Sequence, residues 1–245
     1  MFETLLVLDG TPVELEAHLA RLGDSVRALY GTELPAQAGE LVRRRAVGLA
    51  PGRLRLTAAP AEDGSVGLTV VTATVDAADV FPSWERSAVL RPFLVEGGLG
   101  PHKWADRREL AELESGLAAG ELPLLVDAGE EALECSRANV FALDGEVLLT
   151  PPADGRILAG VARARVIEEA RSRGIEVREE PLTLDRMVSA AEAFLTGSVR
   201  GIEPVRAVAD SRLHEPGARA RELAAELRAT WEGQAERARA ASPAG

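Results

Sequence analysis

The apolar residues of the chain recur with two periods, one typical of helices and the other of strands. Between residues 14 and 30 they are spaced three or four positions apart, which places them on one helical face: Leu15, Leu19, Leu22, Val26 and Leu29. The run at residues 2–8 is short and mostly apolar, and the turn pair Asp9-Gly10 follows it. The chain therefore opens with a predicted strand followed by a predicted helix.

The same two patterns predict elements along the rest of the chain. Further helices are expected at residues 37–49, 106–118, 161–174, 183–188 and 216–238. Further strands are expected at residues 53–59, 66–75, 87–95, 122–127, 131–135, 139–150 (a hairpin that turns at Asp144-Gly145), 175–180 and, as a pair, around 193–208. Because strands and helices alternate in both halves, the sequence predicts an α/β or α+β fold.

The segment EGGLGPH, residues 96–102, is rich in glycine and contains a proline, so it is the best candidate for a linker. It divides the chain into a predicted N-terminal α/β subdomain, residues 1–95, and a larger C-terminal subdomain, residues 103–238. Residues 239–245 are mostly small, and they are expected to form a frayed tail.

Composition narrows the class of protein. The chain has 245 residues, enough for one large domain or two small ones, and its 28 basic and 39 acidic residues give a formal charge of −11. This charge disfavours binding to nucleic acid or to a membrane surface, although local arginines can still bind a small anionic substrate. A single cysteine, Cys135, excludes an intrachain disulfide, and no segment resembles a signal peptide or a transmembrane helix. We therefore expect a cytoplasmic protein.

Only one of the 28 basic residues is a lysine, Lys103, and the other 27 are arginines. Lysine is normally a common residue, so arginine has replaced it almost everywhere. A guanidinium serves as a surface cation or a phosphate ligand, but it stays charged and cannot attack a carbonyl carbon as a neutral amine does. Lys103 therefore marks a position where an amine is needed, unless it is a stray surface residue.

Three other kinds of site receive less support. A P-loop would need glycine at position 102 and Ser or Thr at 104, where His102 and Trp104 stand, and no G-x-G-x-x-G run lies between a strand and a helix. The remaining histidines, His18 and His214, lack metal-ligand spacing to each other or to His102, so no metal site is expected. A nucleophilic pair of Cys135 with His102 stays open, although Cys135 lies in an apolar run typical of a core strand.

Four features together match the needs of pyridoxal phosphate chemistry: Lys103, Glu134, the helix start after Gly160, and the T-G-S run at residues 196–198. The cofactor needs an amine for its Schiff base and an acid that keeps its pyridine nitrogen protonated. It also needs a phosphate cradle. The first N–H groups of a helix, at Val161 and Ala162, can supply one together with the Ser198 hydroxyl.

The chain resembles the class IV aminotransferase family, the pyridoxal phosphate enzymes of fold type IV, over nearly its whole length. Six blocks carry the resemblance in order: FETLLVLDG, HLARL, HKWADRREL, ALECSRANVF, LLTPPADGRILAGVARARV and FLTGSVRGIEPV. The resemblance implies a smaller N-terminal α/β subdomain, a larger barrel-like C-terminal subdomain, and a homodimer with active sites near its interface.

The family's site residues fall on seven positions of this sequence. By resemblance, Lys103 carries the cofactor as a Schiff base and shuttles protons, and Glu134 faces the pyridine nitrogen. The resemblance places Arg21, Val161, Ala162 and Ser198 around the phosphate, and Gly197 is a further cofactor-binding position.

Within the family, three features resemble 4-amino-4-deoxychorismate lyases, which release 4-aminobenzoate and pyruvate. HKWADRREL resembles the H-K-x-x-x-R-R sequence of lyase domains fused to aminodeoxychorismate synthase, SVRGIEPV resembles their S-V-R-G-x-x-P run, and those domains also begin near FET. Branched-chain and D-amino-acid aminotransferases use active-site tyrosines. This chain has Tyr30 alone, and Arg108 stands where a branched-chain enzyme has its tyrosine.

Two positions depart from the expected pattern, because Gly197 replaces the lyases' usual Asn and Ala162 replaces the commoner Thr. An aminotransferase acting on a branched-chain, D-amino acid or pathway-specific amino donor is therefore the alternative. The lyase substrate is a small anionic amino compound with two carboxylates, so arginine clamps are expected, with Arg107 and Arg200 as candidates.

Overall fold

The computed structural model describes residues 1–213 and 217–241, which form two compact units. The first, called here the N-terminal unit, comprises Met1–Val80, His102–Ala105 and Arg228–Gly245, of which residues 228–241 are described. The second, called the barrel unit, comprises Phe81–Pro101 and Asp106–Leu227.

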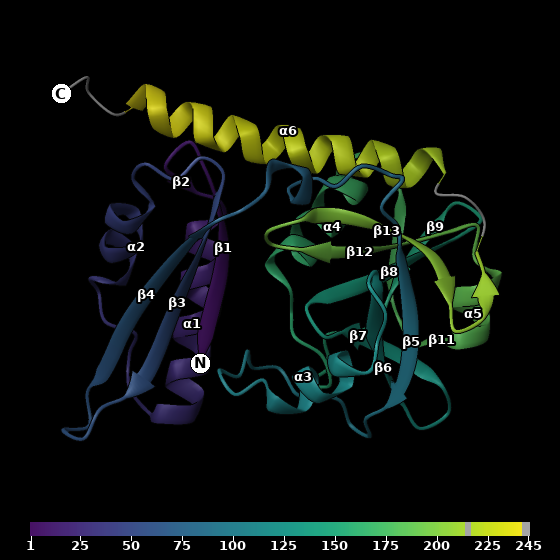
Figure 1. Cartoon of the computed structure of the whole chain (residues 1–245), viewed down its shortest axis with the longest axis horizontal. Helices are drawn as coiled ribbons and strands as arrows, with labels where there is room; N and C mark the ends of the chain where they lie inside the picture. The colour runs from purple at the N-terminus through teal and green to yellow at the C-terminus, as the bar shows by residue number, and fades with distance from the viewer. Residues whose placement is uncertain (214–216, 242–245) are drawn as a thin grey trace. The chain divides into compact units, whose positions relative to one another are not determined.

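The N-terminal unit is an antiparallel sheet with two helices packed against it (Figure 1). Its strands, in the order β2-β1-β3-β4, are β1 (Phe2–Leu8), β2 (Thr11–Pro12), β3 (Gly52–Pro60) and β4 (Val66–Thr74), and its helices are α1 (Leu15–Tyr30) and α2 (Ala38–Ala46). Alternate residues of β3, namely Leu54, Leu56 and Ala58, are fully buried in one core cluster with residues of both helices. This alternation makes one face of the sheet the core face.

The barrel unit contains a closed ring of six strands. In ring order they are β8 (Ala138–Asp144), β12 (Glu192–Gly197), β13 (Gly201–Val208), β5 (Ala88–Leu94), β6 (Glu121–Asp127) and β7 (Glu131–Cys135), and pairing of β7 with β8 closes the ring. One cluster of buried apolar residues draws on all six strands, so side chains fill the barrel.

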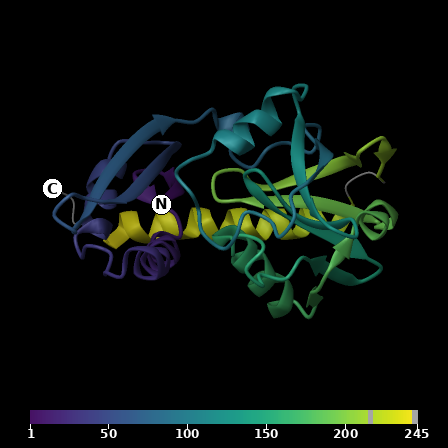
Figure 2. The ribbon, with the colours of Figure 1, turned by 90° about the horizontal axis from the view of Figure 1, so that it is seen from below.

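Shorter strands and helices complete the fold. The added strands are β9 (Val147–Thr150), β10 (Glu176–Glu179), β11 (Leu182–Thr183) and β14 (Ser211–Arg212). The helices are α3 (Arg108–Ser115), α4 (Val161–Ser172), α5 (Leu184–Ser189) and α6 (Ala218–Ala241), with a 3-10 turn at Ala77–Asp79. Helix α6 is one continuous helix, yellow in Figures 1 and 2. In the described residues, no helix is both long and apolar enough to cross a membrane.

Every predicted helix and strand is present, with ends that shift by a few residues. The two-residue strands β2, β11 and β14 were not predicted, because so short a pairing leaves no period in the sequence. The predicted frayed tail differs as well: residues 239–241 continue α6, and residues 242–245 lie outside the described part of the chain.

The boundaries of the two units also differ from those that the sequence suggested. Strand β5, which falls within the predicted N-terminal subdomain, pairs in parallel with β6 and β13 and so belongs to the barrel. Residues His102–Ala105 belong instead to the N-terminal unit. A glycine-rich composition marks an irregular segment, but it does not reveal which unit the flanking backbone pairs with.

Candidate active site

The only lysine of the chain is held by the N-terminal unit. The backbone N–H of Phe2 donates to the carbonyl oxygen of Lys103 at 3.1 Å, and Lys103 Nζ lies 5.1 Å from the centre of the Phe2 ring. On one side of Lys103, the Nδ1 atom of His102 lies 3.0 Å from the hydroxyl of Ser25 on α1. On the other side, Trp104 is exposed and packs edge-on against His102. The half-buried Lys103 thus sits on a backbone fixed from both the sheet and a helix.

Arg21, the predicted phosphate ligand, belongs to the same unit and binds a buried carboxylate. Arg21 Nε donates to Glu3 Oε1 at 2.8 Å and Arg21 Nη2 donates to Glu3 Oε2 at 2.6 Å. The His18 ring adds a contact of 2.7 Å from Nδ1 to the same Oε2 atom. Burial alone would raise the pKa of Glu3. The hydrogen bond from His18 and the charge and hydrogen bonds of Arg21 outweigh it and hold that pKa at about 2.

His18 is nevertheless not charged by its carboxylate partner. The side chain is 1% exposed, and this burial lowers the pKa of the imidazole below its usual value despite the opposing effect of Glu3. The nearby charges of Arg21 and Lys103 act in the same direction as burial. His18 is therefore a neutral donor in the core. The sequence left it as one of three scattered histidines, because its carboxylate partner lies 15 positions away on another element.

In the barrel unit, Glu134 is held by two neighbouring segments. Glu134 on β7 is paired in register with Asn139 on β8, and Asn139 Nδ2 donates to Glu134 Oε2 at 3.3 Å. The backbone N–H of Leu158 donates to Glu134 Oε1 at 3.2 Å, while Leu158 O accepts from Asn139 Nδ2 at 2.9 Å. Glu134 is 8% exposed and its carboxylate has a fixed orientation, as an acid directed at a ring nitrogen would need.

Helix α4 begins directly beside this carboxylate network. Its N-cap residue is Gly160, and a Cβ atom there would lie 2.0 Å from Asn139 Oδ1, so no other residue fits without a shift. The first turn follows at Val161 and Ala162, whose N–H groups have no carbonyl four residues before them within the helix. Such a helix start attracts anions through its N–H groups and its dipole.

The T-G-S run lies at the end of β12, in register with the same row. Thr196 pairs with Asn139 across β12 and β8, so Glu134, Asn139 and Thr196 lie side by side on three neighbouring strands. The Thr196 hydroxyl is buried and has no hydrogen-bond partner in the described part of the chain. Gly197 pairs with Gly201, and the half-buried Ser198 occupies the turn that follows. The row and Ser198 together offer a carboxylate, an amide and two hydroxyls, and these polar groups fit a phosphorylated pyridine.

The two predicted substrate arginines both have partners within the barrel unit. Arg107 Nη2 donates to the carbonyl oxygen of Ser136 in the β7–β8 turn. Arg200 forms a fork with Glu203, with Nε to Oε2 at 3.0 Å and Nη2 to Oε1 at 3.1 Å. Their role as carboxylate clamps stays a prediction. The contact of Arg200 with Glu203 joins the β12–β13 turn to β13, and the spacing rule for helices does not predict it.

The other candidate chemistries gain no support from the structure. Cys135 is buried in the barrel core, and that burial raises the pKa of its thiol well above the usual value, which disfavours the thiolate form. Among the residues that the structure describes, no group of three or more acidic, histidine or cysteine side chains is placed to hold a metal ion. His214 lies outside those residues.

Comparison with known families gives one match that covers most of the chain. Residues 1–208 match the family model described as amino-transferase class IV. A curated relative, branched-chain amino acid aminotransferase 1 of Humulus lupulus, is 39% identical over 75 residues, which are 31% of this chain and 19% of the relative. The matched segments span less than half the length of the first curated relatives.

Solved structures confirm the predicted fold class. The 4-amino-4-deoxychorismate lyase from Pseudomonas aeruginosa is 25% identical and superposes with a TM-score of 0.78, covering 94% of this chain and 90% of that one. A hypothetical aminotransferase from Mycobacterium tuberculosis, in its form with pyridoxal phosphate bound, is 24% identical with a TM-score of 0.79, covering 96% and 89%. The match to the class IV family, whose solved neighbours include forms with pyridoxal phosphate and with pyridoxamine 5'-phosphate bound, confirms the predicted cofactor.

Proposed function

Because the chain belongs to the class IV amino-transferase family, we propose that it is a pyridoxal phosphate enzyme that converts 4-amino-4-deoxychorismate to 4-aminobenzoate and pyruvate. Similarity to the P. aeruginosa lyase over nine-tenths of both chains supports the lyase reaction, and so do the H-K-x-x-x-R-R and S-V-R-G-x-x-P sequences.

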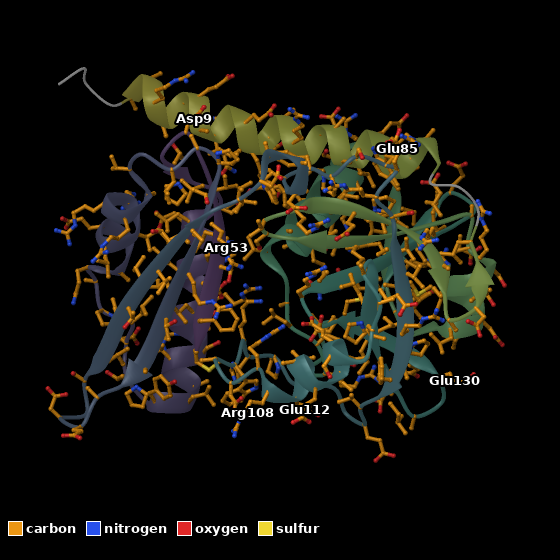
Figure 3. All side chains as sticks on the ribbon, in the orientation of Figure 1. Asp9, Arg53, Glu85, Arg108, Glu112 and Glu130 are labelled. Atoms are coloured by element: carbon orange, nitrogen blue, oxygen red, sulfur yellow. The ribbon has the colours of Figure 1, made fainter. Side chains whose placement is uncertain are left out.

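The observation that most favours a lyase over an aminotransferase is that the barrel unit contains no tyrosine. The only tyrosine of the chain, Tyr30, ends α1 in the N-terminal unit, where its hydroxyl accepts from the Met1 amino group at 3.3 Å. Arg108 stands where a branched-chain enzyme has its tyrosine. It is an exposed side chain at the molecular surface (Figure 3), and it pairs with Asp106. A chain without these hydroxyls fits a reaction that does not depend on them.

In the proposed reaction, Lys103 and Glu134 have separate chemical roles. When bound, pyridoxal phosphate supplies an electron-accepting ring next to the substrate carbon that bears the amine. Lys103 Nζ would hold the cofactor and then take the proton from that carbon, and no other side chain of the sequence offers an amine. The Glu134 carboxylate, oriented by Asn139 and Leu158, would keep a proton on the ring nitrogen. Loss of pyruvate then leaves an aromatic product, which favours the forward reaction.

The proposed reaction also defines the substrate and the partners that we expect. The substrate is a small amino compound with two carboxylates, and we assign Arg107 and Arg200 to them as candidates because arginine binds carboxylates through paired N–H groups. We also propose a homodimer, as the resemblance implies. Neither nucleic acid nor a membrane is a proposed partner, because the chain carries a formal charge of −11.

An aminotransferase is the second candidate, and a specific observation favours it. Several curated relatives are named as branched-chain aminotransferases, at 34–40% identity over parts of the chain. In this reaction Lys103 would return the proton to the cofactor rather than let the side chain leave. A keto acid would then be the product.

Incubation with aminodeoxychorismate separates the two reactions. The lyase proposal expects 4-aminobenzoate and pyruvate in equal amounts from the protein loaded with pyridoxal phosphate. Absence of both products, together with conversion of the bound cofactor to pyridoxamine phosphate by an amino acid, would establish the aminotransferase instead. A protein that stays colourless after loading with pyridoxal phosphate would refute both.

A further inference from the structure

We infer that Glu3 and His18 are positioning residues that orient the Arg21 guanidinium toward the phosphate group of the cofactor. The inference rests on the proposed function, because that function identifies pyridoxal phosphate as the ligand. It concerns two residues that neither the sequence patterns nor the family resemblance assigned to any role. We call the three side chains together the Glu3 triad.

Both oxygens of the Glu3 carboxylate accept hydrogen bonds. Glu3 accepts on both oxygens from Arg21, at 2.8 and 2.6 Å, and its Oε2 atom also accepts from His18 at 2.7 Å. A guanidinium is rigid and planar, so two donors fixed to one carboxylate determine the directions of all its other N–H groups. His18 prevents the carboxylate from rotating, because it binds the oxygen that Arg21 Nη2 also uses.

Burying the charge of the Glu3 carboxylate costs free energy. Glu3 is 1% exposed, and its neighbours Leu5, Leu6 and Val7 on β1 are buried and apolar. An ion pair in such surroundings is weak evidence for stability, since apolar residues of similar size often stabilise as well or better. A buried carboxylate therefore needs another reason, and holding one charged side chain in one orientation is such a reason.

The three side chains of the Glu3 triad differ in how far they are exposed to solvent. The Arg21 side chain is 14% exposed, while those of Glu3 and His18 are 2% exposed each. Arg21 is thus the member that reaches the surface, and the other two support it from the core. His18 and Arg21 are three positions apart on α1 and share one helical face. Because His18 is neutral, Arg21 is the only cation among the three side chains of the triad.

A second arginine of the same helix, Arg27, also binds one carboxylate through two N–H groups and provides a matched control. Arg27 binds Glu33 through Nε at 2.9 Å and Nη2 at 3.0 Å, which repeats the Arg21–Glu3 geometry. Both of these side chains are more than half exposed, so solvent surrounds the pair. An exposed pair of this kind contributes little, and we expect no effect of Glu33→Gln on cofactor binding.

The test compares two ligands that differ only in the phosphate. Dissociation constants for pyridoxal phosphate and for pyridoxal are measured by visible absorbance on wild-type protein and on Glu3→Gln, His18→Leu, His18→Asn and Glu33→Gln. We expect Glu3→Gln to weaken pyridoxal phosphate about tenfold or more and pyridoxal less than about twofold. His18→Leu should act in the same direction, and His18→Asn, which keeps a donor near Nδ1, should recover most of the loss.

The possible outcomes separate the inference from the function. Equal weakening of both ligands, or of neither, in Glu3→Gln and His18→Leu would overturn the inference while leaving the proposed function standing. A wild-type protein that binds neither ligand would refute the function itself. Circular dichroism and thermal unfolding without ligand show whether each variant folds. If neither Glu3→Gln nor His18→Leu folds, the triad is a structural element and the inference is wrong.

Discussion

The backbone N–H of Phe2 donates a hydrogen bond to the carbonyl oxygen of Lys103, 101 positions further along the chain. Phe2 is the first residue of β1, so the segment that carries the only lysine joins the N-terminal unit at the start of its first strand. The Phe2 ring lies 5.1 Å from Lys103 Nζ. Phe2 therefore contacts both the backbone and the amine of Lys103.

Replacing Lys103 tests whether its amine, rather than its charge, is what matters. Lys103→Arg keeps a cation of similar length, but a guanidinium cannot form a covalent bond to the cofactor aldehyde. We expect both Lys103→Arg and Lys103→Ala to lose the visible absorbance of the bound cofactor and to reduce turnover by roughly 10³-fold or more. Absorbance spectra and turnover assays on the loaded protein measure this.

Arg108→Lys provides the control, because it adds a second lysine at an exposed position on α3. This variant should keep wild-type absorbance and turnover. If Lys103→Arg retained both properties, the amine would have no special role and Lys103 would be a stray surface residue.

Substitution of Gly160 probes the link between α4 and the Glu134 network. A Cβ atom at Gly160 would lie 2.0 Å from Asn139 Oδ1, so Gly160→Ala must displace the amide that supports Glu134. Overpacking of this kind typically costs about 1–3 kcal/mol. We expect a lower free energy of unfolding and weaker cofactor binding. Gly116→Ala is the control, because a Cβ atom there would meet no other atom within 4 Å and the φ of Gly116 is ordinary, so chemical denaturation should show little loss.

The sequence predicted the elements of this fold well, for reasons visible in single segments. The three- and four-residue spacing of Leu15, Leu19, Leu22 and Val26 reflects the face of α1 that packs on the core, where Leu19 is partly buried. The apolar residues 193–195 lie in β12, close to where a strand was expected. Local periodicity reports burial, and burial here follows the regular geometry of each element.

The contacts between elements could not be predicted in the same way. The row of Glu134, Asn139 and Thr196 depends on the register of three strands, which a pattern within each strand does not contain. The partnership of Glu3 with His18 joins β1 to α1 across 15 positions. The family resemblance supplied candidate residues for the site, and only the structure shows which side chains contact them.

Acid should destabilise the protein through the Glu3 triad. The pKa of Glu3 is about 2 in the folded state against 4.5 for an ordinary glutamate, so its stabilisation is complete above pH 4.5 and is lost as the pH falls toward 2. The shift corresponds to roughly 3 kcal/mol. The pKa of His18 is also lowered, so its neutral form stabilises above its ordinary pKa of 6.5 and loses that contribution below it.

Both effects have the same sign, and unfolding measured by denaturant across pH 7 to 2.5 tests them. Wild-type protein without cofactor should lose stability steadily as the pH falls through this window. Glu3→Gln should show a flatter profile at its acid end, and Glu33→Gln should follow the wild type. A wild-type profile no steeper than that of Glu3→Gln would contradict the ionised state of Glu3.

Cys135 should resist thiol reagents in the folded protein. It is buried in the barrel core and the pKa of its thiol is raised, so neither access nor the thiolate form is available. We expect no reaction with a colorimetric disulfide reagent at pH 8, and one equivalent of reaction after unfolding. Rapid labelling of the folded protein, accompanied by loss of activity, would revive the pairing of Cys135 with His102.

Glu134 should govern turnover more than cofactor binding. Glu134→Gln keeps the size of the side chain and an acceptor for the Leu158 N–H, but it cannot keep a proton on a ring nitrogen by charge. We expect kcat to fall by roughly 10² to 10³-fold, with a change of only a few-fold in the dissociation constant for pyridoxal phosphate. Glu131→Gln on the same strand is the matched control, because Glu131 pairs with Arg156 and does not take part in the Glu134–Asn139–Leu158 contacts. Its kcat should stay near that of the wild type, whereas an unchanged kcat in Glu134→Gln would remove the carboxylate from the proposed chemistry.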